Sequence, residues 1–88
     1  MEQRFRAGVV ADDITGANDI GLMFSQGGLS AAVVSLKDQP REEDFADAGV
    51  WIVNTDSRLD SPELAAQKSA AAARFLRDAG CRMVYTKT

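Results

Sequence analysis

Short apolar runs alternate along the chain with amphipathic stretches, a pattern typical of proteins in which β-strands and α-helices follow one another. Nearly continuous apolar runs bounded by charged or turn-forming residues indicate strands that are buried on both faces of a parallel sheet. The predicted strands cover residues 5–11, 31–36, 50–53 and 82–85. The third of these, Val50-Trp51-Ile52-Val53, is the most hydrophobic segment of the chain.

Helices are predicted over residues 16–26 and from Pro62 to Ala79, because apolar residues recur there at helical spacing. Gly27-Gly28 ends the first helix, and Ser61 is a good N-cap for the second. The acidic stretch 37–49 connects the second and third strands, with a short helix expected near 42–48.

This order of elements predicts an α/β fold with three αβα layers, in which right-handed crossovers join the strands of an open parallel sheet. We expect about four strands in the Rossmann-like or flavodoxin-like order 2-1-3-4. The first and third strands are then neighbours whose connections leave in opposite directions, so their polar ends flank one crevice. Lys87, at the end of the fourth strand, is expected one strand beyond the third.

The first strand ends in two adjacent carboxylates, Asp12 and Asp13, followed by Thr15 and Gly16 at the start of a helix. One interpretation is a helix cap, since Asp and Thr are good N-cap residues. Two neighbouring carboxylates repel each other, however, and so indicate a ligand, a cation or a positive side chain that gathers there. We therefore favour a site over a simple cap.

Composition narrows the function classes. The chain has 88 residues, enough for one domain, and a net charge of −3 with scattered basic residues, which offers nothing to nucleic acid or to a membrane surface. It has no His and only one cysteine, Cys81, so an internal disulfide, a Cys/His metal cluster and a His-activated nucleophile are excluded. We expect a cytoplasmic protein without a metal site. The sequence contains no P-loop and no dinucleotide-binding fingerprint, so it shows no recognisable ATP-binding site.

The predicted crevice gathers groups that suit a small polyhydroxylated anion, because carboxylates accept hydrogen bonds from hydroxyls and Arg matches a carboxylate or phosphate. The simpler alternatives are an ion pair of Arg58 with Asp56 or Asp60, and a solvated terminus at Lys87. The candidate residues are the acceptors Asp12, Asp13 and Asp56, the hydroxyls of Thr15, Ser57 and Thr86, and the cations Arg58 and Lys87.

Three segments together resemble the N-terminal part of the four-carbon acid sugar kinase family: Val10-Ala11-Asp12-Asp13-Ile14-Thr15-Gly16-Ala17, Asn54-Thr55-Asp56-Ser57-Arg58 and Tyr85-Thr86-Lys87-Thr88. The family phosphorylates threonate, erythronate or 3-oxo-tetronate with ATP and Mg²⁺. Residues 1–88 then form the N-terminal part of the acid-sugar-binding domain. The nucleotide-binding domain and the family's next motif, Asp-Ser-Thr-x-Arg-Gly, are absent, so we expect no cofactor and no catalysis from this chain alone.

The resemblance implies a substrate site for a small four-carbon sugar acid. It assigns Arg58 to the substrate carboxylate and Asp13 to a hydroxyl, with Asp13 as the hypothetical catalytic base. The implied substrate-binding residues are Asp12, Asp13, Thr15, Gly16, Asp56, Ser57, Arg58 and Lys87.

Two alternatives stay open. A phosphoacceptor receiver domain has an acidic pair after its first strand and a phosphorylated Asp after its third, which Asp12-Asp13 and Asp56 imitate. The chain could instead be a non-catalytic fragment that forms a homodimer by pairing an open strand edge.

Overall fold

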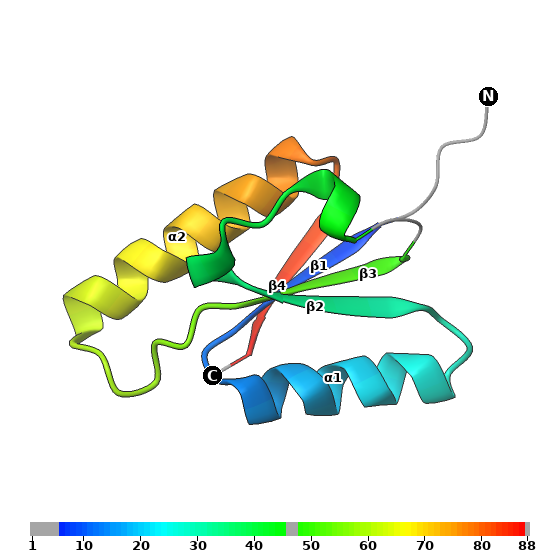
Figure 1. The fold of residues 1–88 in the computed structure, drawn as a ribbon, viewed down its shortest axis with the longest axis horizontal. Coiled ribbons are helices and arrows are strands. Elements are labelled where there is room, and N and C mark those ends of the chain that lie inside the picture. The colour runs from blue at the N-terminus through cyan, green and yellow to red at the C-terminus, as the bar shows by residue number, and fades with distance from the viewer. Residues whose placement is uncertain (1–5, 46–47, 88) are drawn as a thin grey trace.

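Four parallel strands form one open sheet, with one long helix on each face (Figure 1). The computed structural model describes residues 6–45 and 48–87. The strands are β1 (Ala7–Ala11), β2 (Ala31–Ser35), β3 (Val50–Asn54) and β4 (Met83–Lys87). The long helices are α1 (Ile14–Gln26) and α2 (Pro62–Asp78), and two 3₁₀ turns cover Leu36–Asp38 and Glu42–Asp44. The predicted α/β class and three-layer arrangement are confirmed.

Two predicted bounds differ from the structure or lie outside its described residues. The first strand was expected to begin at residue 5, which lies outside the described residues. The short helix expected over 42–48 is a single 3₁₀ turn, Glu42–Asp44, and residues 46–47 also lie outside the described part.

The strand order is β2-β3-β1-β4, so the predicted order 2-1-3-4 is wrong. The central pair β1 and β3 is predicted correctly, but the two outer strands have exchanged sides. In its described residues the connection from β2 to β3 contains two 3₁₀ turns and no long helix, and it joins neighbouring strands instead of crossing over β1. The two crossovers that skip a strand are those with the long helices. They run in opposite directions across the sheet, and right-handed crossovers of opposite direction lie on opposite faces.

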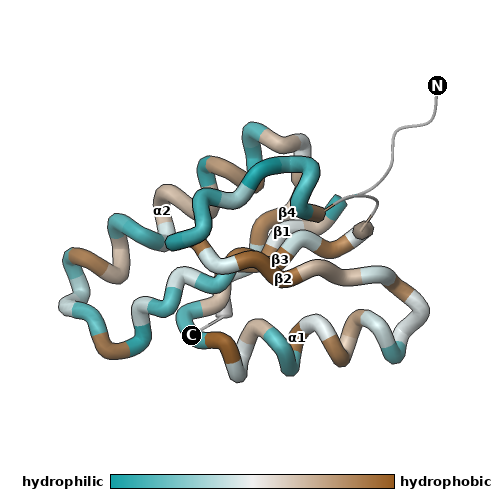
Figure 2. Tube along the Cα trace, in the orientation of Figure 1, coloured by the Kyte–Doolittle hydropathy of each residue, from teal (hydrophilic) through white to brown (hydrophobic). Residues whose placement is uncertain are grey.

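The central strands carry the core. Every residue of β1 and β3 is buried. On one face Val9 and Ile52 pack with Ala17 of α1, and on the other Val10 and Trp51 pack in one cluster with buried residues of α2. Figure 2 shows hydrophobic residues gathered along the strands, whereas each helix alternates between hydrophilic and hydrophobic residues.

An aromatic cluster fills the α2 face beside the β2–β3 connection. Phe45 stacks on Trp51 with ring centroids 4.5 Å apart, and Phe75 of α2 lies 5.9 Å from Phe45. Phe45 and Trp51 are each 1% exposed. Burying two such rings stabilises the fold by several kcal/mol, on the order of 1.5–3 for each. Phe45 thus closes the part of this face that no long helix covers.

Arg6 joins the start of the sheet to the end of α2. Its Nη1 donates to the carbonyl oxygen of Ala79 at 2.8 Å, and its Cζ lies 4.9 Å from the centroid of the Trp51 ring. A cation at a helix C-terminus is favourable because the last carbonyls carry a partial negative charge. Cys81 is buried, and burial raises the pKa of its thiol, an effect that the charge of Arg6 opposes.

Helix α2 packs very closely on β1 at Gly8. A Cβ atom at this position would lie 3.0 Å from Cδ1 of Leu76, closer than ordinary van der Waals contact. The missing side chain therefore sets the distance between α2 and the sheet.

Neither long helix, nor any other helix within residues 6–45 and 48–87, is long and apolar enough to cross a membrane.

Replacing Leu76 by Ala tests the α2 face of the core. Leu76 is fully buried, so Leu76→Ala should lower the free energy of unfolding by about 2–5 kcal/mol through lost transfer energy and a residual cavity. Urea denaturation followed by circular dichroism measures the change. The matched control Leu22→Ala removes a side chain that is 59% exposed and should change stability by less than about 0.5 kcal/mol. Equal losses in both variants would contradict the assigned core.

Candidate functional site

Backbone hydrogen bonds tie the loop after β3 to the end of β1. The amide of Thr55 donates to the carbonyl oxygen of Ala11 at 2.8 Å, and the amides of Ser57 and Arg58 donate to that of Asp12 at 2.9 and 3.1 Å. We call the region formed by Asp12, Asp13 and residues 55–58 the β1/β3 junction. The structure thus places the two predicted polar strand ends side by side.

Asp13 performs two structural tasks at the junction. It is the N-cap of α1, where its Oδ1 accepts from the Gly16 amide at 2.6 Å. Its Oδ2 accepts from Nη1 of Arg58 at 3.0 Å, forming an ion pair across the junction. The helix-cap interpretation is therefore correct, and the positive side chain expected beside the acidic pair is Arg58. The alternative pairs of Arg58 with Asp56 or Asp60 are not the ones observed.

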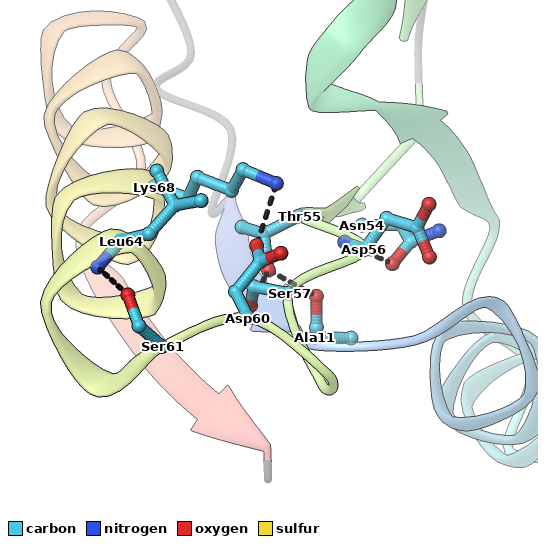
Figure 3. Close-up of polar contacts among 9 residues, drawn as sticks. All are labelled: Ala11, Asn54, Thr55, Asp56, Ser57, Asp60, Ser61, Leu64 and Lys68. Atoms are coloured by element: carbon cyan, nitrogen blue, oxygen red, sulfur yellow. Dashed lines mark hydrogen bonds and ion pairs between the residues drawn. The ribbon is translucent and has the colours of Figure 1, made fainter.

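A buried hydroxyl pair stiffens the loop after β3 (Figure 3). The Thr55 hydroxyl donates to the carbonyl oxygen of Ala11 at 3.2 Å, and the oxygens of the Thr55 and Ser57 hydroxyls lie 2.7 Å apart. Because a hydroxyl has one hydrogen and that of Thr55 is already used, Ser57 is the donor in this pair. Ser57 is 3% exposed, so its hydroxyl makes a contact inside the loop and does not face solvent in this structure.

Asp56, in the loop after β3, has a left-handed backbone conformation with φ of 52°. Its amide donates to Oδ1 of Asn54 at 3.0 Å, an Asx-type turn that compensates for the unusual conformation. Asp and Asn tolerate this region better than most residues. The Asp56 side chain is exposed, as a ligand contact requires.

A second anchor connects the same loop to α2. Nζ of Lys68 donates to Oδ2 of Asp60 at 2.6 Å, with both side chains partly buried, and Ser61 caps the helix by accepting from the Leu64 amide at 3.2 Å (Figure 3). Sequence reasoning predicted the Ser61 cap but missed the Lys68–Asp60 pair. The only available signal was a Lys that interrupts the partly buried side of an Ala-rich helix.

The other predicted site residues lie around this junction. Asp12 is half-buried, Thr15 is exposed in the first turn of α1, and Thr86 is exposed on β4. Lys87 pairs in register with Ala11, so it lies beyond β1 and not, as expected, beyond β3. Its side chain lies outside the described part. The ligand contacts of all these residues stay predictions.

Within residues 6–45 and 48–87, no group of three or more His, Cys, Asp or Glu side chains could hold a metal ion. An apolar hollow of about 260 Å³ lies at the other end of the sheet, because its lining includes Ala7 and Val50, the first residues of β1 and β3. It is separate from the β1/β3 junction.

Comparison with known proteins identifies the family. Residues 7–88 match the family model described as "Sugar-binding N-terminal domain". The chain belongs to this family. Its sugar-binding domain is similar to the 3-oxo-tetronate kinases of Actinobacillus succinogenes (32% identical over 80 residues), Pseudomonas fluorescens (35% over 82) and Pectobacterium atrosepticum (34% over 82). These alignments cover 91–93% of this chain but only 19% of each kinase. No solved structure matches the chain.

The two tasks of Asp13 can be separated by substitution. Asp13→Ala should lower the free energy of unfolding by about 1 kcal/mol, because it removes the cap of α1. Asp13→Asn should change it by less than about 0.5 kcal/mol, because Asn caps as well as Asp and an exposed ion pair contributes little. Urea denaturation of both variants measures the difference. An equal loss in both would show that the charge of Asp13, and not its capping oxygen, stabilises the fold.

The hydroxyl pair of Thr55 and Ser57 predicts which of two substitutions lowers the stability of the protein more. Thr55→Val should cost about 1–3 kcal/mol, because the buried Ser57 hydroxyl loses its acceptor. Ser57→Ala should cost less, since Thr55 keeps its bond to Ala11. Thermal unfolding of both variants gives the order, and the reverse order would contradict the assigned direction of the hydrogen bond.

Proposed function

We propose that this domain binds a four-carbon sugar acid at the β1/β3 junction, as the substrate-binding part of an ATP-dependent acid sugar kinase. The main support is one observation of geometry: Arg58 reaches across the junction to Asp13, beside Asp12, at the joined carboxyl ends of two parallel strands. In open α/β sheets this edge is where ligands usually bind.

The chemistry of the junction suits threonate, erythronate or 3-oxo-tetronate. A guanidinium binds a carboxylate through two parallel N–H bonds, and carboxylates accept hydrogen bonds from sugar hydroxyls. Arg58 is 70% exposed on its side chain and can therefore be reached by a ligand. The sugar-binding family and the 3-oxo-tetronate kinase names of the relatives support the same substrate class.

Phosphoryl transfer needs groups that we do not find in this sequence. It contains no P-loop to cradle the phosphates of ATP. We infer that ATP and Mg²⁺ bind to the part of the full-length kinases that this chain does not cover, and that this chain does not phosphorylate its ligand alone. A cytoplasmic location belongs to the same proposal.

The receiver alternative has less support. A receiver has the strand order 2-1-3-4-5, whereas this sheet has the order β2-β3-β1-β4. Incubation with acetyl phosphate and Mg²⁺ should therefore leave Asp56 unmodified. Dimerisation through an edge strand, β4 or β2, stays a prediction, which light scattering at increasing protein concentration tests.

Binding of threonate and erythronate without ATP tests the proposed function. Isothermal titration calorimetry should show binding of at least one of these acids by the protein. Arg58→Met should weaken it about 10- to 100-fold, because a hydrogen-bonded charge pair is lost. The control Arg74→Met removes an equally positive, exposed side chain from α2 and should leave affinity unchanged. Equal weakening by both variants would indicate attraction by net charge and contradict a site at Arg58.

A further inference from the structure

We propose that Asp13 is a positioning residue for Arg58, and that Asp12 is the carboxylate that receives a substrate hydroxyl. This inference rests on the proposed function and assigns separate roles to two adjacent, chemically identical side chains. It replaces the hypothesis that Asp13 contacts the hydroxyl or acts as the base.

Both carboxylate oxygens of Asp13 already accept hydrogen bonds. Oδ1 accepts from the Gly16 amide at 2.6 Å, and Oδ2 accepts from Arg58 at 3.0 Å. The Asp13 side chain is only 24% exposed. A substrate hydroxyl would have to compete with an amide and a guanidinium, or turn the carboxylate and release the first turn of α1.

The guanidinium of Arg58 keeps donors that Asp13 does not use. Arg58 uses only Nη1 in its bond to Asp13, and a guanidinium has five N–H donors. The edge formed by Nε and Nη2 stays able to bind a carboxylate through two parallel bonds. Asp13 therefore orients Arg58 without occupying it. A long side chain that is held before the ligand arrives loses less conformational entropy on binding.

Asp12 differs from Asp13 in which of its oxygens accept hydrogen bonds. Its backbone oxygen accepts from the amides of Ser57 and Arg58, so the residue is fixed between the two loops. Among the described residues, no hydrogen bond or ion pair involves its carboxylate, and the residue is half-buried. Asp12 thus has a fixed backbone, and its carboxylate has no partner among the side chains that the structure describes.

A double-mutant cycle on ligand binding separates these roles. Threonate and erythronate are titrated into ¹⁵N-labelled protein, and amide shifts give affinities that extend into the millimolar range. Asp13→Asn, which keeps a capping oxygen, should weaken binding about 2- to 10-fold through lost ordering of Arg58. In the Arg58→Met background the same substitution should have no further effect.

Asp12→Asn should weaken binding about tenfold or more, and by the same factor in both backgrounds, because it acts on a hydroxyl and not through Arg58. If Asp13→Asn keeps its full effect without Arg58, Asp13 contacts the ligand itself and the positioning role is overturned. If Asp12→Asn has no effect in either background, the role of Asp12 is overturned while the proposed function stands. Failure of the unchanged protein to bind either acid would overturn the proposed function and, with it, this inference.

Discussion

The hydrogen bonds accepted by two carbonyl oxygens at the end of β1 determine the geometry of the whole junction. Ala11 and Asp12 together accept from three backbone amides and one hydroxyl of the loop that follows β3. An exposed ion pair such as that of Arg58 with Asp13 is worth only about 0–1 kcal/mol and could not hold two loops together. The backbone therefore brings the loops together, and the ion pair only selects the direction of one side chain.

The arrangement of the helices leaves this junction accessible. The chain turns to one face of the sheet after β1 and to the other after β3, because α1 and α2 cover opposite faces (Figure 1). The two helices start beside the same edge and diverge from it. The connection from β2 to β3 lies on the α2 face, where Phe45 fills the space beside Trp51. The core is thus closed in the middle of the sheet, while the polar groups collect at its end.

Much of this architecture is readable in the sequence. The apolar run 50–53 and the acidic turn at Asp12-Asp13 predict buried central strands and a polar junction, because hydrophobic patterning reports burial directly. Patterning does not report which strands are neighbours, however. The orders 2-1-3-4 and 2-3-1-4 both bury the first and third strands in the centre, so they give the same apolar pattern. The described part of the connection, residues 36–45, holds two 3₁₀ turns, as a connection between neighbouring strands allows, but the pairing of β2 with β3 is visible only in the structure.

The details of the site were harder to predict for a related reason. The Ser57 hydroxyl points into its own loop next to a positive φ at Asp56, and composition reveals neither feature. The pair of Lys68 and Asp60 joins a loop to the second turn of a helix, and no periodicity marks such a contact. The sequence therefore indicates the residue types at the junction, and backbone conformation determines which of their side chains are exposed.

The close packing at Gly8 extends the influence of the core to this edge. Leu76 rests against the bare backbone of β1, and the same helix carries Lys68, which holds Asp60 two residues after Arg58. A methyl group at position 8 would require Leu76 of α2 to give way by a few tenths of an ångström. The close approach of α2, and with it the position of Lys68 beside the loop, thus depends on the absence of one carbon atom in the interior of the sheet.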